Sequence, residues 1–213
     1  MRITVFGATG GTGKQLVQQA LDQGHAVTAV VRDPARLPID HHALTVVKAE
    51  LTDTAGVRAA IEGQDAVLSA LAASRKQGEI ATAGVRGMLA AMATTGVRRL
   101  LVVSAAPLGP LPKGETLAGR LAIPLVRTIF RDVYADLRVM EKEVERSDTD
   151  WTIVRPPRLL DTPRTGDHRR AFGGAVAGGH SISRADLANA MLEMITETEP
   201  VRQIVGVSAA ATG

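Results

Sequence analysis

The sequence contains no cysteine and few aromatic residues, and each shortage excludes a class of protein. Without cysteine, the 213 residues can form neither a disulfide scaffold nor a thiolate nucleophile. Aromatic side chains make up 2% of the chain, and the formal net charge is only +3. Nucleic-acid binding usually needs a basic stripe or aromatic side chains that stack on bases, so we expect no nucleic-acid partner.

Long apolar runs and metal-ligand patterns are missing as well. No apolar run reaches about 18 residues, the length of a membrane-spanning helix, and we expect no membrane association. The five histidines show no metal-ligand spacing, so we expect no metal. The chain enters a strand at once, so we expect no signal peptide. Together with the lack of cysteine this favours a cytoplasmic location.

A glycine-rich stretch, FGATGGTGKQ, begins at Phe6, the last residue of the short apolar run Ile3–Phe6. Such a loop binds phosphate either as the P-loop of an ATP- or GTP-binding protein or as the cradle of a dinucleotide. A P-loop needs glycine where Ala8 stands, and serine or threonine where Gln15 stands. The P-loop interpretation therefore fails on two residues.

The dinucleotide interpretation fits the spacing of the glycines. Gly7, Gly10 and Gly13 form G-x-x-G-x-x-G between an apolar strand and a helix with one apolar face. In dinucleotide folds these positions allow a tight turn, the approach of pyrophosphate and close packing of helix on strand. An ordinary strand–turn–helix corner is the alternative, and the flanking strand and helix favour the cofactor site. Candidate contacts in the loop are Gly7, Thr9, Gly10, Gly11, Thr12 and Gly13.

Strand-like and helix-like runs alternate along the chain. Strands are expected at Ile3–Phe6, Ala26–Val31, Leu44–Val47, Asp65–Ser69, Arg98–Ser104 and Trp151–Val154. Helices are expected after the glycine loop and at Thr54–Glu62, Glu79–Thr95 and about Leu121–Ser147. This order predicts an α/β fold, a single-domain, Rossmann-like, doubly wound parallel sheet with helices on both faces. Ligands of such sheets bind at the carboxyl ends of the strands.

Two segments rich in proline or glycine interrupt the alternation, at residues 105–119 and 159–179. Each is either a plain surface loop or a mobile lid. We expect residues 1–213 to form one NAD(P)-binding Rossmann domain, with a small substrate-side portion from loops 105–119 and 156–182. Ser183 with Asp186 resembles a capping box that starts the last helix, which is a structural role.

The end of the second strand indicates which dinucleotide binds. NAD-preferring folds usually place an acidic residue there, to bind the ribose 2′-hydroxyl. This strand ends instead at Arg32, with Arg36 nearby, and a guanidinium can pair with the 2′-phosphate of NADP. Asp33 precedes Pro34, which favours a turn-forming role, and Thr12 can add a hydroxyl. We therefore expect NADP(H) to be preferred over NAD(H); the alternative for Arg36 alone is a solvated loop charge.

A family resemblance rests on several segments taken in order. They are GATGGTGK, VTAVVRDPARLP, VVKAELTD, EGQDAVLSAL, GVRRLLVVSA, YADLRVMEKEVERSDTDWTIVRPPRL and SISRADLANAML, and they span most of the chain. Together they resemble the atypical short-chain dehydrogenase/reductases, in the NAD(P)H-binding, NmrA-like branch. Within that branch the sequence is most similar to the biliverdin IXβ reductase/flavin reductase group.

The resemblance implies that residues just after the strands surround the cofactor. These are Arg32, Arg36 and Thr12 at the 2′-phosphate, Glu50 and Leu51 at the adenine, Ala70 and Leu71 under the ribose, Ser104 beside the nicotinamide, and Pro156 and Pro157 flanking its ring. The family usually has aspartate where Glu50 stands, and the longer side chain leaves the adenine contact open.

The candidate catalytic residues are Ser104 and Tyr134. Typical short-chain dehydrogenases use Tyr-x-x-x-Lys, in which the lysine lowers the tyrosine pKa. Here Tyr134 is followed four residues later by Arg138, on the same helix face. Either the arginine biases the tyrosine electrostatically, or this is a helix-edge tyrosine beside a solvated arginine. The flavin/biliverdin reductase group implies no tyrosine–lysine pair, because solvent can supply the protons.

These features predict an enzyme, an NADPH-dependent oxidoreductase that transfers hydride to a flat conjugated acceptor such as a flavin, quinone or tetrapyrrole. The alternative is a non-catalytic NADP(H)-binding redox sensor of the NmrA type. A nucleotide-sugar epimerase or dehydratase is a third candidate, disfavoured by the missing lysine and the short C-terminal part. The expected partner is a small-molecule acceptor. Monomer and homodimer both stay open, because the apolar segment Leu121–Val133 suits either a dimer contact or packing on the sheet.

Overall fold

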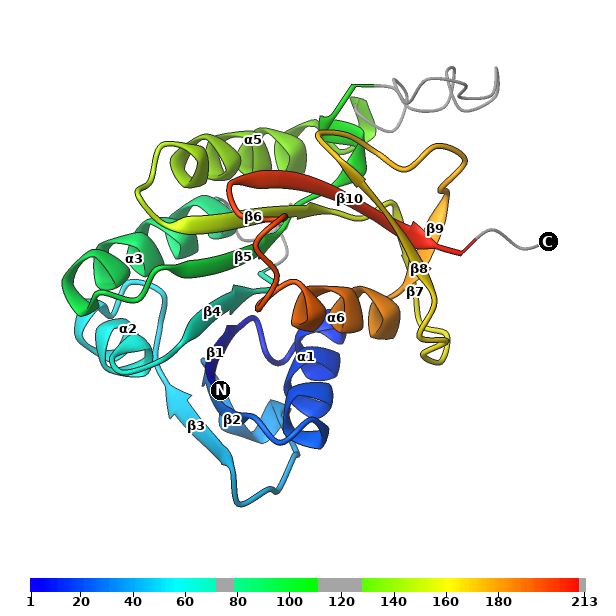
Figure 1. Cartoon of the computed structure of the whole chain (residues 1–213). Coiled ribbons are helices and arrows are strands. Elements are labelled where there is room, and N and C mark those ends of the chain that lie inside the picture. The colour runs from blue at the N-terminus through cyan, green and yellow to red at the C-terminus, as the bar shows by residue number, and fades with distance from the viewer. Residues whose placement is uncertain (72–78, 111–127, 211–213) are drawn as a thin grey trace.

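A mostly parallel sheet runs through the molecule between two layers of helices (Figure 1). The computed structural model describes residues 1–71, 79–110 and 128–210. Within them, the eight strands of the main sheet are β1 (Arg2–Phe6), β2 (Ala26–Val31), β3 (Leu44–Lys48), β4 (Ala66–Ser69), β5 (Arg99–Val103), β6 (Asp150–Arg155), β8 (His168–Phe172) and β10 (Gln203–Ala209). Their order is β3-β2-β1-β4-β5-β6-β10-β8, and only β8 pairs antiparallel to its neighbour. The predicted doubly wound α/β fold is confirmed.

The direction of winding reverses between β1 and β4, which are hydrogen-bonded neighbours although β2 and β3 lie between them in sequence. Both halves of the sheet therefore start at this point and grow outward. The carboxyl ends of β1 and β4 are left without a crossing connection above them, and this is where such sheets bind ligands. A second, two-stranded sheet pairs β7 (Arg158–Leu160) with β9 (Ser181–Ser183).

Helices cover both faces of the sheet and enclose two apolar cores. On one face lie α1 (Gly11–Asp22) and α6 (Arg184–Glu193), and on the other lie α2 (Thr54–Ile61), α3 (Ile80–Thr95) and α5 (Arg131–Glu145). The alternation of side chains along β1 shows the division, because Ile3 and Val5 belong to the first core and Phe6 to the second. Each of these three side chains is fully buried.

The predicted helix at about Leu121–Ser147 is interrupted at Phe130, since residues 128 and 129 before it are helical and α5 follows it. The described helix α5 starts at Arg131, because Phe130 before it has non-helical dihedrals of φ −109° and ψ 26°. Ile129, just before this break, is 46% exposed. Residues 121–127, and with them most of the segment considered for a dimer contact, lie outside the described residues. The helical spacing of apolar residues continues across the single non-helical residue Phe130, so the spacing alone does not show where α5 begins.

The sequence did not predict the four strands that follow β6, which are β7, β8, β9 and β10. The segment 159–179, expected to be a loop, contains the end of β7 and all of β8. Strand β8 lies at an edge of the main sheet and reads HRRAF, so it lacks the apolar run that marks a buried strand. The other segment, 105–119, is described only as far as residue 110, and it begins with a short 3-10 turn at Ala106–Leu108.

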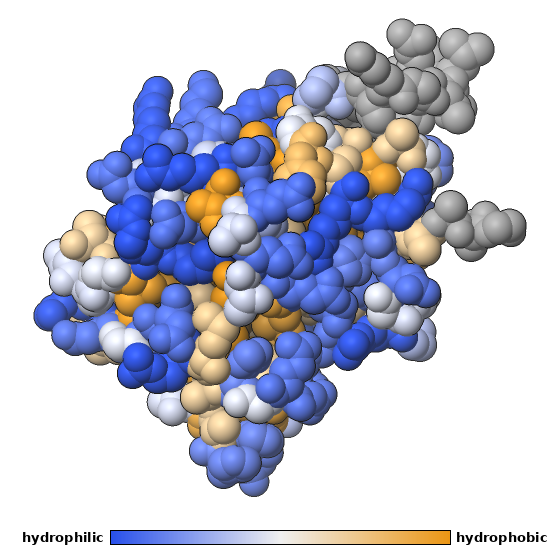
Figure 2. All heavy atoms as spheres, viewed as in Figure 1, coloured by the Kyte–Doolittle hydropathy of each residue, from blue (hydrophilic) through white to orange (hydrophobic). Residues whose placement is uncertain are grey.

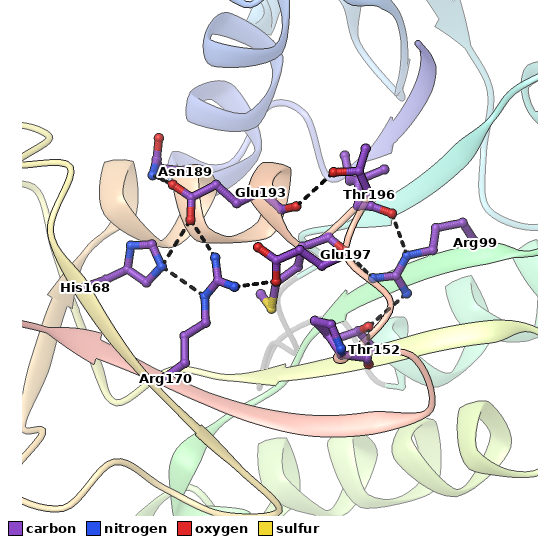
Figure 3. A network of polar contacts seen from close by, with 11 residues as sticks. Arg99, Thr152, His168, Arg170, Asn189, Glu193, Thr196 and Glu197 are labelled. Atoms are coloured by element: carbon purple, nitrogen blue, oxygen red, sulfur yellow. Dashed lines mark hydrogen bonds and ion pairs between the residues drawn. The ribbon is translucent and has the colours of Figure 1, made fainter.

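Charged side chains fasten β8 and the end of α6 to the sheet (Figure 3). Arg170 of β8 pairs with Glu193 of α6 and with Glu197, and its Nε donates a hydrogen bond to His168 Nε2 at 3.0 Å. Burial lowers the pKa of His168, which suits the neutral ring that this hydrogen bond requires. At the start of β5, Arg99 donates to backbone carbonyls just after α6. These contacts hold the C-terminal part against the sheet.

The surface is mostly polar on the face shown in Figure 2, where hydrophobic residues show only in small areas. Helix α5 illustrates how this arises, since Met140 and Val144 are buried while Arg138 and Lys142 are exposed. Among the described residues, no helix is both long enough and apolar enough to cross a membrane.

Candidate functional site

A cleft of about 660 Å³ opens at the carboxyl ends of β1 to β4, beside the point where the winding reverses. It is lined from four strand ends and from the start of α3. Most of the predicted cofactor contacts meet there: Gly7, Thr9, Gly10, Arg32, Arg36, Glu50, Leu51, Ala70 and Leu71. Residues from separate parts of the sequence are thus brought to one surface, which has the place and size expected of a dinucleotide site.

Two glycines of the loop are required by the protein's own packing. Gly7 has a φ of +75°, and a Cβ there would lie 2.7 Å from the backbone carbonyl carbon of Ala70. A Cβ at Gly13 would lie 2.0 Å from the carbonyl oxygen of Gly7. Neither position has room for a side chain, so Gly7 makes the turn and Gly13 lets α1 pack against it.

Gly10 differs, because the space beside it belongs to the cleft. Its backbone is extended, with φ −79° and ψ 165°, and a Cβ there would meet only the Gly7 carbonyl oxygen, at 3.3 Å. Gly10 is also the N-cap of α1, with no side-chain capping bond and no acidic residue in the first turn. Backbone N–H groups and the positive end of the helix dipole are therefore available to an anion. This donor set fits the pyrophosphate of a dinucleotide.

Just after β2, where NAD-binding folds usually have an acidic residue, the cleft is lined by basic side chains. Arg32 and Arg36 are both exposed and line the cleft. The neighbouring carboxylate of Asp33 instead caps the 3-10 turn Pro34–Arg36 and accepts a hydrogen bond from the Ala35 N–H at 3.1 Å. The turn-forming role predicted for Asp33 is confirmed. Glu50 lines the same cleft and is exposed.

Some predicted contacts lie apart from this cleft. Thr12, on the first turn of α1, is only 7% exposed and is not among the lining residues. Gly11 and Gly13 also lie outside the lining. The same holds for the three residues expected near the nicotinamide, which are Ser104, Pro156 and Pro157, and for the catalytic candidate Tyr134.

Ser104 belongs to a buried polar cluster at the ends of β5 and β6. Its hydroxyl donates a hydrogen bond to Glu141 Oε1 at 2.6 Å. Arg155 grips both oxygens of the same carboxylate, with Nε at 2.8 Å from Oε1 and Nη2 at 2.7 Å from Oε2. The side chains of Arg155 and Glu141 are 9% and 7% exposed. This bidentate pair gives both oxygens of Glu141 a charged donor, and Ser104 is held with its proton directed at the same carboxyl group.

The cluster also positions the backbone that follows β5. The Ser104 N–H donates to the Val154 carbonyl at 2.7 Å, and the Ala106 N–H donates to the Pro156 carbonyl at 2.8 Å. A Cβ at Gly109 would lie 3.0 Å from Arg155 Nη1, so the turn packs directly on the guanidinium. Pro156 thus has a described structural contact, through its carbonyl oxygen.

Tyr134 and Arg138 share a helix but not an environment. Tyr134 is 8% exposed and packs in the core that includes Leu137 and Met140, with its ring 6.2 Å from that of Phe130. Arg138 is exposed. This geometry favours the structural interpretation of the pair over a catalytic one.

Sequence reasoning missed Glu141 as a site residue and treated Arg155 only as the residue before Pro156. A signal was present for Glu141, which falls beside Met140 and three residues before Val144 on the apolar face of α5. A carboxylate at such a position needs a buried partner.

Ser183 and Asp186 form the expected cap, since Ser183 Oγ accepts from the Asp186 N–H at 2.8 Å. The Asp186 carboxylate additionally accepts from the N–H groups of Thr165 and Gly166.

Comparisons with known proteins agree with this architecture. An uncharacterized chloroplastic protein of Arabidopsis thaliana is 28% identical over 220 residues, covering 99% of this chain and 77% of that protein. A short-chain dehydrogenase/reductase of Veillonella parvula, solved in complex with NADP, superposes with a TM-score of 0.80 at 21% identity, over 99% of this chain and 95% of that one. A candidate NADH-flavin reductase of Streptococcus pneumoniae gives 0.81 at 23% identity, over 99% and 100%.

At these identities the two solved structures establish a shared fold. The family follows from a model described as NAD(P)H-binding, which matches residues 7–198. That match begins at Gly7, the turn of the glycine loop, and extends past the end of α6. The chain therefore belongs to the NAD(P)H-binding family.

Proposed function

We propose that this protein is an NADPH-dependent oxidoreductase that transfers hydride to a flat conjugated acceptor such as a flavin, a quinone or a tetrapyrrole. One observation carries the proposal: the cleft joins the open N-terminus of α1 to the Arg32 and Arg36 side chains, at the reversal of the sheet. Its two ends offer donors for pyrophosphate and for a 2′-phosphate. The shared fold with a candidate flavin reductase also supports it.

When bound, a reduced nicotinamide supplies the hydride, and the chain supplies binding and orientation. The glycine loop binds the pyrophosphate, and Arg32 and Arg36 bind the adenosine end. The ion pair of Glu141 with Arg155 fixes Ser104 and the turn at Ala106–Leu108, which border the reacting end in this proposal. The acceptor gains a hydride from the cofactor and a proton from solvent, so no side-chain acid is required.

The cofactor preference is tested at Arg32. We expect NADPH to bind more tightly than NADH, and we expect Arg32→Ala to remove most of the difference. A charge-assisted pair to phosphate contributes about 1.5–3 kcal/mol, or roughly 10- to 150-fold in affinity. Calorimetric titration of both cofactors into both proteins measures the effect. Arg58→Ala serves as control, because Arg58 is an exposed arginine of α2 that does not line the cleft. Equal affinities in the unmodified protein would contradict the proposal.

A non-catalytic NADP(H) sensor is the second candidate. It is favoured by one feature among the described residues: the Ser104 hydroxyl donates its proton to Glu141 and so is not offered to a substrate. Loss of NADPH absorbance with FMN, menadione or biliverdin separates the two candidates. Turnover with any of these acceptors supports the reductase. Tight NADPH binding without turnover on the whole panel supports the sensor instead.

Tyr134 tests how the proton is supplied. We expect Tyr134→Phe to change kcat by less than tenfold, because Tyr134 is buried in a core and Arg138 points into solvent. If Tyr134 were a general acid, its loss would cost about 10²–10⁴-fold. The measurement is kcat on the best acceptor of the panel at saturating NADPH, with Ser104→Ala measured alongside. A decrease beyond a hundredfold for Tyr134→Phe would restore a tyrosine-dependent mechanism.

A further inference from the structure

One arginine lies against the start of α1 without having been assigned a role. Arg184 is the first residue of α6, and its side chain crosses to Gly11, the first residue of α1. A Cβ at Gly11 would lie 2.5 Å from Arg184 Cδ and 2.8 Å from its Nε. Glycine at this position therefore leaves the space that the arginine fills. Gly11 directly follows Gly10, which lines the cleft, whereas Arg184 itself lies just outside that lining.

This placement is electrostatically unfavourable unless an anion is near. The N-terminus of a helix carries a partial positive charge, and a cation beside it is repelled. No acidic residue in the first turn of α1 offsets that charge. The carboxylate that faces Arg184 is Asp161, with Oδ1 at 2.7 Å from Nη1.

The ion pair with Asp161 is a weak one. The Asp161 side chain is 85% exposed, whereas that of Arg184 is 29% exposed. A carboxylate so fully in water gives little net stabilisation, because water competes for it and the side chain loses rotamer freedom. The Arg184 side chain is thus held in place by its packing on Gly11, while replacing Asp161 by another anion costs little free energy.

We propose that Arg184 binds the pyrophosphate of the dinucleotide, exchanging Asp161 for phosphate oxygens when the cofactor binds. This inference rests on the proposed function and extends it by one binding residue. A guanidinium matches phosphate bidentately, and the N–H groups at the start of α1 contact the same anion from the other side. In the protein without cofactor, Asp161 forms an ion pair with this guanidinium. Because Asp161 follows β7 directly, cofactor binding also frees the segment after β7 from one of its contacts.

The direct test compares two ligands that differ in the pyrophosphate. 2′-Phospho-ADP-ribose carries it and lacks the nicotinamide, whereas adenosine 2′-monophosphate lacks both. We expect Arg184→Ala to weaken binding of 2′-phospho-ADP-ribose by about 10- to 100-fold, as for loss of a charge-assisted bond. Binding of adenosine 2′-monophosphate should stay unchanged. Arg98→Ala is the matched control, since Arg98 also pairs with an aspartate, Asp150, but at the amino ends of β5 and β6, away from the cleft.

Asp161→Asn provides a second, opposite test. Removing the competing carboxylate should tighten binding of 2′-phospho-ADP-ribose by up to about fivefold, the size of a weak surface pair. The gain should vanish when Arg184→Ala is combined with it, because coupling between the two sites is what a double-mutant cycle measures. Asp161 is exposed, so the substitution leaves folding intact.

The outcomes separate this inference from the proposed function. If Arg184→Ala binds both ligands as the unmodified protein does, Arg184 is not a pyrophosphate ligand and the cofactor site stands without it. An equal loss for both ligands would also overturn the inference, since it would indicate a general disturbance of the cleft. If the unmodified protein binds neither ligand nor NADPH, the proposed function itself is wrong, and the role of Arg184 falls with it.

Discussion

Replacing Gly10 by valine should abolish dinucleotide binding and leave the protein folded. The backbone of Gly10 is extended, a conformation that suits valine, and its missing Cβ would touch only one protein atom, the Gly7 carbonyl oxygen at 3.3 Å. A small relaxation of the loop accommodates that contact. The two methyl groups would instead project into the cleft, where the pyrophosphate must approach the start of α1. We expect the Kd for NADPH to rise by more than about 100-fold, since close approach and several N–H contacts are lost together.

Calorimetric titration and circular dichroism of the same variant measure binding and folding separately. The matched control is Gly174→Val, because a Cβ at Gly174 would meet no atom within 4 Å and the residue does not line the cleft. Gly13→Val should behave differently from both, since its Cβ would fall 2.0 Å from a backbone oxygen and prevent the helix from packing. A folded Gly10→Val protein with unchanged Kd would show that the glycine loop is not the pyrophosphate site.

How much of the fold the sequence predicts depends on where each element gets its stability. The strand Ala26–Val31 was predicted with the bounds it has, because a strand buried between two layers must be apolar along its whole length. Strand β8 was missed for the converse reason. It is an edge strand, and its Arg170 pairs with carboxylates of α6 and of the segment after α6, which the local sequence of β8 does not indicate.

The site divides in the same way. The glycine loop is a sequence motif, and Arg32 stands at the end of the next strand. The positions of both in the site follow from the strand–turn–helix geometry of a dinucleotide fold. The cluster of Ser104, Glu141 and Arg155 instead joins two strand ends and a helix, so it exists only once the sheet and α5 have packed. Tyr134 shows that spacing alone does not define a site. Its spacing to Arg138 is that of Tyr-x-x-x-Lys, but Tyr134 is buried and Arg138 is exposed.

Breaking the buried ion pair at Glu141 should have the largest effect on stability. Glu141→Ala leaves the guanidinium of Arg155 with 9% exposure and without its carboxylate. Removing one partner of a buried pair costs about 3–5 kcal/mol, because the remaining charge keeps its desolvation penalty. For a chain of this size that loss corresponds to a decrease in Tm of roughly 6–20 °C. Thermal unfolding of the two proteins at the same pH measures it.

Helix α5 provides the control for this prediction. Glu143 also pairs with an arginine, Arg86, at 2.7 Å, but both of these side chains reach solvent, and Glu143→Ala should leave Tm nearly unchanged. Replacing both members of the buried pair, as Glu141→Leu with Arg155→Met, should restore most of the stability, since no charge is then left unpaired. The doubly substituted protein would still lack the carboxylate that orients Ser104 and the guanidinium on which the turn after β5 packs. We therefore expect it to fold and to bind NADPH at the glycine loop, yet to lose turnover. Equal losses of stability for Glu141→Ala and Glu143→Ala would contradict the assignment of the buried pair as the element that holds this end of the site.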